Sequence, residues 1–201
     1  MQKDLSTEER ILSAAQKVFL AKGMDGARMQ DIADEAGINK ALLHYYFRSK
    51  DKLFEEIFLK VAASFLPKIF QVLNTDSSVF GKIESFCDEY ISQIVKTPYV
   101  PIFILNEINR QPKTFLKKVF GSNKPPVEKF FKQISEEVQA GIIKPVEPFH
   151  LLINVLSLCV FPVLASPLIQ LVGGLNNEQF NQMMERRKKE VSQLIINSIK
   201  T

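Results

Sequence analysis

The chain is short of the residues that build most catalytic and metal sites. Its 201 residues include only two histidines and two cysteines, and none of these stand in pairs at the spacing of metal ligands. A glycine-rich phosphate loop and a G-x-S-x-G segment are also missing from the sequence. We therefore expect no enzymatic activity, no metal and no cofactor.

Signals for β-strands are missing as well. Glycine (8 residues) and proline (10 residues) are sparse, and no segment alternates polar and apolar residues as strands do. Apolar residues instead recur at helical spacing through most of the chain, without internal repeats. The sequence, with 46% hydrophobic and 24% charged residues, predicts a soluble, all-α globular protein.

The first ten residues are polar and charged, so a signal peptide is not indicated. Both cysteines, Cys87 and Cys159, lie in apolar helical contexts, which predicts buried free thiols. Together these features predict a protein of the reducing cytoplasm.

The stretch from Leu151 to Val172 carries no charged residue over 22 positions. A transmembrane helix needs about 20 apolar residues, so this length raises a membrane-associated alternative. However, Asn154 and Gln170 interrupt the stretch, and Pro162 and Pro167 would break the helix. We interpret it as a buried helix and expect no membrane partner.

Residues 29–50 predict two short helices joined by a tight turn. Ile32 and Ala36 recur at helical spacing, and Gly37 follows at the point where a helix end favours a residue that tolerates positive φ. Asn39 is a good N-cap for a second helix, Lys40 to Phe47. This arrangement is typical of a helix-turn-helix, whose second helix enters the DNA major groove.

Neighbouring helices complete the predicted domain. Ser6 and Glu9 form a capping box for a helix that ends near Gly23. Ser49 can cap the helix that starts at Lys50, where an ammonium and free backbone N–H groups can hold a phosphate together. We expect Pro67 to end or kink that helix.

Residues 31–54 read D-I-A-x-x-A-G-I-x-K-x-x-L-x-Y-Y-F-x-S-K-x-x-L-F, preceded by Gly26 and Ala27. This pattern resembles the DNA-binding domain of TetR/AcrR-type transcriptional regulators. The resemblance implies a homodimeric regulator, most often a repressor, that binds a pseudo-palindromic double-stranded DNA operator and is released by a small effector. It implies a DNA-binding domain over residues 1–50 and a helical effector-binding and dimerisation domain over residues 51–201. A helical protein-interaction protein and a membrane-associated protein are the alternatives.

Two residues depart from the family pattern. Arg28 replaces the Ser or Thr that usually caps the first helix of the motif, and His44 stands where Tyr is common. We expect Lys40, Ala41, Leu42 and His44 to read bases, and Arg28, Asn39, Tyr45 and Lys50 to hold phosphates, with Gln30 also in the site.

Beyond Leu66 the resemblance is one of layout. It implies an effector pocket, for which we select residues on apolar faces: Phe65, Phe86, Tyr90, Phe103, Glu107, Phe130 and Phe161. The expected effector is lipophilic or aromatic, and Glu107 leaves room for a cationic one. The resemblance implies that the last two helices of each subunit pack against their mates as a four-helix bundle, and the stretch from Leu151 to Val172 and the helix from Glu178 to Ile199 look like that pair. On the last helix we expect an exposed dimerisation stripe: Phe180, Met184, Val191, Leu194 and Ile195. The run from Arg186 to Lys189 is interpreted as a solvated face.

Overall fold

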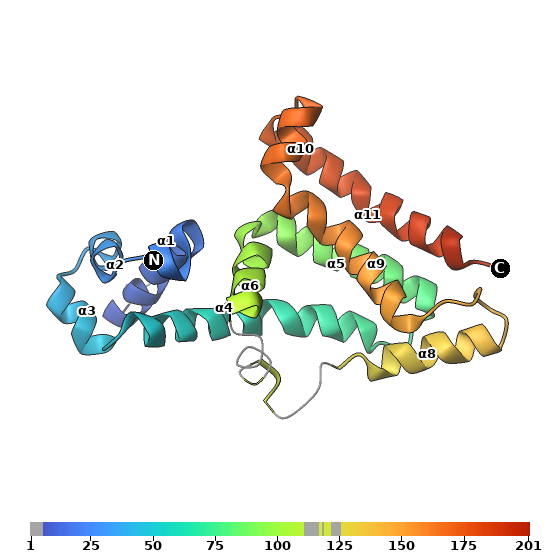
Figure 1. Ribbon diagram of the computed structural model, residues 1–201, viewed down its shortest axis with the longest axis horizontal. Coiled ribbons are helices and arrows are strands. Elements are labelled where there is room, and N and C mark those ends of the chain that lie inside the picture. Colours follow the sequence, from blue (N-terminus) through green and yellow to red (C-terminus); the bar gives the residue numbers. More distant parts are fainter. Residues whose placement is uncertain (1–5, 111–116, 118, 122–125) are drawn as a thin grey trace. The chain divides into compact units, whose positions relative to one another are not determined.

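The computed structural model describes residues 6–110, 117, 119–121 and 126–201, and the described residues form helices without named strands (Figure 1). The expected all-α class is therefore confirmed. The chain divides into two compact units. The first unit comprises Met1–Ala63 and Phe103–Val119, and the second comprises Ser64–Ile102 and Phe120–Thr201. This division differs from the expected boundary after residue 50.

The first unit contains α1 (Thr7–Gly26), α2 (Met29–Ala36), α3 (Lys40–Tyr46), the start of α4 (Lys50–Leu73) and the end of α6 (Tyr99–Arg110). Ser6 caps α1 in the expected capping box with Glu9, and Gly23, at φ 68°, interrupts the helix before one last turn. An aromatic chain fills the core: Phe19 and Phe103 both contact the Phe54 ring, at centroid distances of 5.0 and 5.2 Å. The end of α6 is thus packed into the same core as α1.

The sequence predicted that Pro67 would end or kink α4. The helix does not end there but continues to Leu73. Proline inside a helix removes one N–H donor and costs about 3 kcal/mol. Phe65, Ile69 and Leu73 are all buried on one face of α4, on both sides of the proline. Their packing offsets the missing hydrogen bond, so tertiary burial overrides the local preference.

The second unit is built around α5 (Val79–Lys96), which packs against both α9 (Pro148–Leu164) and α11 (Asn177–Ile199). Cys87 of α5 and Cys159 of α9 are buried free thiols, as predicted, and their Sγ atoms lie 3.8 Å apart. Helix α8 (Glu128–Gln139) packs against α5 and α9, and the short α10 (Ser166–Gly173) follows α9.

The uncharged stretch forms α9 and α10, with a bend of 72° between them. Within the described residues, no single helix is long and apolar enough to cross a membrane, whereas this bent pair meets the requirement by length and composition. The break falls at Ala165, directly before α10 and its Pro167. Pro162, by contrast, lies inside α9 and does not end it.

Pro162 leaves the carbonyl of Leu158 without its usual partner four residues later. Arg187 of α11 replaces that partner, because its Nε and Nη2 donate to the Leu158 oxygen at 3.1 and 3.0 Å. Lys188 also turns inward and pairs with Asp88 of α5 at 3.5 Å. The expectation that residues 186–189 form a solvated face is therefore wrong for Arg187 and Lys188.

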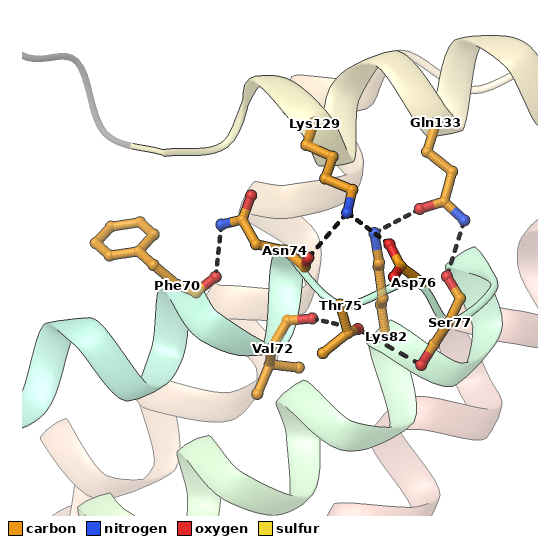
Figure 2. Close-up of polar contacts among 9 residues, drawn as sticks. All are labelled: Phe70, Val72, Asn74, Thr75, Asp76, Ser77, Lys82, Lys129 and Gln133. Carbon is orange, nitrogen blue, oxygen red and sulfur yellow. Dashed lines mark hydrogen bonds and ion pairs between the residues drawn. The ribbon is translucent and has the colours of Figure 1, made fainter.

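Polar side chains fasten α8 to the turn between α4 and α5 (Figure 2). Lys129 donates to the Asn74 carbonyl at 3.1 Å and pairs with Asp76 at 2.7 Å. Gln133 donates to the Ser77 carbonyl at 2.9 Å and accepts from Lys82 Nζ at 2.5 Å. These contacts fix the position of α8 within the second unit.

Candidate DNA-binding site

The turn between α2 and α3 has the geometry that its glycine predicts. Gly37 adopts a left-handed conformation, with φ 66° and ψ 38°. Its N–H donates to the Asp34 carbonyl at 3.1 Å, and Ile38 N–H donates to the Ala33 carbonyl at 3.0 Å. This pair of bonds is the Schellman motif, which ends a helix while satisfying its last carbonyls. Arg10 of α1 supplies one more donor, to the carbonyl of Ala36 at 2.7 Å.

Helix α3 presents two different faces. Asn39 caps it, since its side chain accepts from Leu42 N–H at 2.8 Å. Leu43 and Phe47 are buried, although Phe47 is the C-cap and not the last helical residue. The remaining positions are exposed: Lys40, Ala41, Leu42, His44 and Tyr45. Every residue expected to read bases is therefore accessible on a helix whose other side is fixed in the core.

The start of α2 confirms that Arg28 does not cap the helix. A guanidinium has no acceptor, and no side-chain capping bond is present. Asp31 instead accepts from the Arg28 N–H at 3.1 Å and pairs with Lys22 of α1 at 2.9 Å. The hydrogen bond from Lys22, and then that from the Arg28 backbone, lower the pKa of Asp31. Arg28 is itself exposed and open to a phosphate.

Lys50 has a structural contact that the sequence did not predict. Its Nζ donates to the carbonyl of Ala27 at 3.1 Å, between α1 and α2. Ser49 caps α4 as expected, accepting from Lys52 N–H at 3.3 Å. Gln30 is exposed on α2 and donates to Asp34 at 2.7 Å. Lys50 thus holds the entry to α2, and a phosphate contact of its ammonium stays a prediction.

Two further side chains of this surface were missed by the sequence reasoning. Tyr46 is exposed and meets the Tyr45 ring edge to face, at a centroid distance of 5.5 Å. Arg48 is exposed directly after α3. The signal was available in the run from Tyr45 to Arg48, where aromatic residues at consecutive positions cannot all face the core.

The residues selected for the effector pocket are only partly brought together. In the second unit, Phe65 and Phe86 both contact the Tyr90 ring, at centroid distances of 5.6 and 5.3 Å. Burial raises the pKa of the Tyr90 hydroxyl. Phe130 lies elsewhere in that unit, beneath the Lys82 ammonium.

Three other selections fall outside this cluster. Phe103 belongs to the first unit. The structure corrects Phe161, which is 59% exposed on the outside of α9 because the inner face of that helix is occupied by Val155, Cys159 and Val163. The side chain of Glu107 lies outside the described residues.

The predicted dimerisation stripe also needs correction. Phe180, Met184, Val191 and Ile195 are buried within the chain itself, because α11 packs this face against α5 and α9. Leu194 alone of the predicted set is exposed, at 60%. The prediction that these positions form one apolar face of α11 is confirmed, but the face packs into the core of the same chain.

A capped recognition helix held by two others defines this part of the chain as a helix-turn-helix DNA-binding domain. Residues 11–57 match the sequence model described as "Bacterial regulatory proteins, tetR family". The chain is 24% identical over 196 residues to the HTH-type transcriptional regulator RutR of Escherichia coli K12, covering 96% of this chain and 90% of RutR. It is 42% identical over 59 residues to the HTH-type transcriptional repressor NicS of Pseudomonas putida, covering 29% and 28% of the two chains.

The fold of the whole chain agrees with that assignment. It is similar to the structure of the ketosteroid transcriptional regulator KstR2 of Mycobacterium tuberculosis, with a TM-score of 0.72 and 14% identity over 100% of this chain and 97% of that one. Residues 11–57 therefore form a DNA-binding domain of the TetR type, and the chain is a TetR-type transcriptional regulator by its similarity to such proteins.

Proposed function

We propose that the protein is a homodimeric, effector-released repressor that binds a pseudo-palindromic operator. The observation that carries this proposal is the free outer face of α3, where Lys40, His44 and Tyr45 are exposed while Leu43 is completely buried. In a dimer, two such helices would enter successive major grooves about 34 Å apart. His44 can donate to or accept from a base edge, and the Lys40 ammonium can donate to guanine.

The dimer is expected to form through the outer face of α9. Large apolar side chains are exposed along it and on the adjacent α11: Phe149, Ile153, Leu156, Phe161 and Leu194. A contiguous apolar surface of this kind is typical of a protein interface. A two-fold homodimer brings the same patch of both copies together. An uncharged patch can form such an interface because no like charges meet.

The effector is expected in the second unit, near the buried cluster of Phe65, Phe86 and Tyr90. Such a cluster favours an apolar or aromatic molecule. The effector can release DNA only through a higher affinity for the released dimer than for the bound one. Helices α4 and α6 each contribute residues to both units, so they can carry this difference along the chain.

The DNA-binding proposal can be tested by selecting bound fragments from a genomic library and measuring mobility shifts on the enriched site. We expect His44→Ala to change the preferred sequence, because it removes a base contact. Tyr45→Phe removes one exposed hydroxyl and should weaken all DNA sequences about equally. Thermal melting serves as the control, since both side chains are exposed and neither substitution should alter folding.

Selection of no common site, or binding that is unaffected by both substitutions and by salt, would overturn the proposed role of α3. Release of the operator should then be titrated with neutral lipophiles, lipophilic cations and fatty acids. Failure of all three classes would reject the expected effector chemistry without affecting the DNA-binding proposal.

A further inference from the structure

The aromatic cluster of Phe65, Phe86 and Tyr90 contains one hydroxyl group, that of Tyr90. This residue is buried on α5, with 6% of its surface exposed. Its ring is nearly parallel to that of Phe86, at an interplanar angle of 8°, and meets the ring of Phe65 at 65°. A phenol oxygen lies in the plane of its ring, so these two contacts fix where the hydroxyl lies.

The Tyr90 hydroxyl has no partner in the chain. Among the described residues, none forms a hydrogen bond with Tyr90 Oη. The two polar residues that are buried in this unit do have partners: Lys82 donates to Gln133, and Ser192 donates to the Lys189 carbonyl at 3.0 Å. A hydroxyl that leaves water without gaining a partner costs folding free energy, which phenylalanine at the same position would avoid. The hydroxyl therefore calls for an acceptor from outside the chain.

The hydroxyl is also within reach of such an acceptor. In the part of the chain that the structure describes, Glu137 Oε2 is the only side-chain polar atom that is both sealed from water and without a partner. Tyr90 Oη has no partner either, so it is not sealed, and a water-sized group can reach it. Space beside the hydroxyl is thus open to an atom of a ligand.

The surroundings of Tyr90 favour an uncharged acceptor. Burial raises the pKa of the Tyr90 hydroxyl, so it keeps its proton at neutral pH and can donate. The neighbour that acts on it electrostatically is Cys159, a thiol buried 3.8 Å from Cys87. Arg187 adds positive charge beside Cys159. Among the described residues no carboxylate contributes to the raised pKa, so a cationic ligand would find no counter-charge here.

We infer that the effector is an uncharged, lipophilic carbonyl compound, and that its carbonyl oxygen accepts a hydrogen bond from Tyr90 Oη. This inference rests on the proposed effector-released repressor and names the chemical class of its effector. A carbonyl oxygen only accepts, which matches a hydroxyl that has a proton to donate and no acceptor. The apolar part of the molecule would cover aromatic surface of the cluster. A hydrocarbon of the same shape would leave the hydroxyl unpaired.

The first test uses two pairs of ligands in which a ketone oxygen is replaced by a CH2 group of similar size. Acetylnaphthalene is compared with isopropenylnaphthalene, and acetophenone with isopropenylbenzene, by isothermal titration calorimetry on the full chain. We expect each ketone to bind about tenfold more tightly than its hydrocarbon partner, because only the ketone satisfies the hydroxyl. Tyr90→Phe should abolish this preference and leave the affinity for the hydrocarbons unchanged.

Tyr99→Phe is the matched control. Tyr99 lies at the start of α6 in the same unit and is 36% exposed, so its loss of a hydroxyl should leave the preference for ketones intact. The melting temperature of Tyr90→Phe should equal that of the wild type, since the hydroxyl has no partner within the chain. A clearly lower melting temperature would reveal an internal partner and overturn the inference.

The carbonyl effector would also be overturned by equal affinity of the wild type for ketone and hydrocarbon, by a preference that survives in Tyr90→Phe, or by binding of none of the four ligands. Tighter binding of dodecyltrimethylammonium or of a fatty acid than of the ketones, unaffected by Tyr90→Phe, would assign the cluster to a charged effector and likewise overturn it.

Mobility shifts on the operator separate this inference from the proposed function. If the hydrocarbons release the operator as well as the ketones do, effector-released repression stands and the role of Tyr90 is overturned. If the ketones bind through Tyr90 but the operator stays bound, the hydrogen bond stands and effector-released repression is overturned.

Discussion

The two units expose opposite kinds of surface. In the first unit α3 buries Leu43 and turns Lys40, His44 and Tyr45 outward, so the exposed surface can form hydrogen bonds with a polyanion. In the second unit α9 and α10 turn large apolar side chains outward, which water solvates poorly. Under the proposals above, exposure has a different meaning in each unit: a DNA-binding face in the first and an interface between two copies of the chain in the second.

The signals that define the turn of the first unit are local, although its core is also held by distant contacts such as that of Arg10 with Ala36. The hydrogen bonds of Gly37 and Asn39 reach no further than five residues along the chain. In the second unit, Arg187 contacts Leu158 and the two cysteines meet across 72 residues.

Charges on the outer face of α9 should have the largest effect. Ile153→Glu combined with Leu156→Glu would place four carboxylates in the two-fold interface, and we expect the dimer to weaken by about 1,000-fold. Sedimentation equilibrium measures this directly. The monomer should remain folded because both residues are exposed. A folded double variant that stays fully dimeric would contradict the α9 interface.

Truncation of the buried Leu43 side chain of α3 should destabilise the first unit and leave the second unit unchanged. Leu43→Ala leaves a cavity at a fully buried site, and we expect a loss of about 3 kcal/mol in the free energy of unfolding of the first unit. Urea denaturation measures the loss, and hydrogen exchange should locate it in α1 to α3. DNA binding should fall while dimerisation persists. A parallel loss of the dimer would show that the two units do not behave separately.

The sequence predicted the first unit closely because its signals are local. A glycine at the end of α2, an asparagine before α3 and a serine before α4 each fix a backbone geometry nearby, and all three act as expected. The hydrophobic periodicity of α11 was also read correctly. Periodicity does not show what an apolar face packs against. The apolar stripe of α11, which the sequence analysis assigned to a second subunit, packs against α5 and α9 of the same chain.

The predictions from proline had different outcomes. Pro67 was expected to end or kink α4, but α4 does not end there and continues to Leu73 through buried neighbours. Pro162 and Pro167 were expected to break the uncharged stretch, and it is broken at Ala165 between them, with a bend of 72°, although α9 itself continues through Pro162 with the help of the Arg187 guanidinium. Neither compensation can be seen in the sequence near the proline.

Arg187 should therefore contribute measurably to stability. We expect Arg187→Met to lower the free energy of unfolding by about 2 kcal/mol, because it leaves the part-buried Leu158 carbonyl without a donor. Thermal and urea denaturation provide the measurement, and Arg186→Met, at an exposed position, is the matched control. Adding Pro162→Ala restores the backbone donor and should reduce the loss. If the loss is the same in both backgrounds, the two sites are not coupled.

A smaller effect is expected at the turn before α3. Gly37→Ala forces a side chain into the left-handed region, and its Cβ would lie 3.4 Å from Nη2 of Arg10. We expect a loss of about 1 kcal/mol and a modest decrease in operator affinity. Gly26→Ala is the control, because Gly26 is not at positive φ and its Cβ would make only ordinary contacts. If Gly37→Ala and Gly26→Ala were equally stable, the left-handed conformation of Gly37 would not be required for the turn.

The contacts beneath α8 determine how that helix can move. Gln133 uses both ends of its amide, accepting from Lys82 and donating to Ser77 and Glu137 (Figure 2). If the amide were reversed, its NH2 group would face the Lys82 ammonium, and both groups are donors. Sliding α8 by one turn would displace Gln133 by about 5.4 Å and leave the buried Lys82 ammonium without its acceptor. Small translations of α8 along its axis are therefore penalised, because they break all of these hydrogen bonds together.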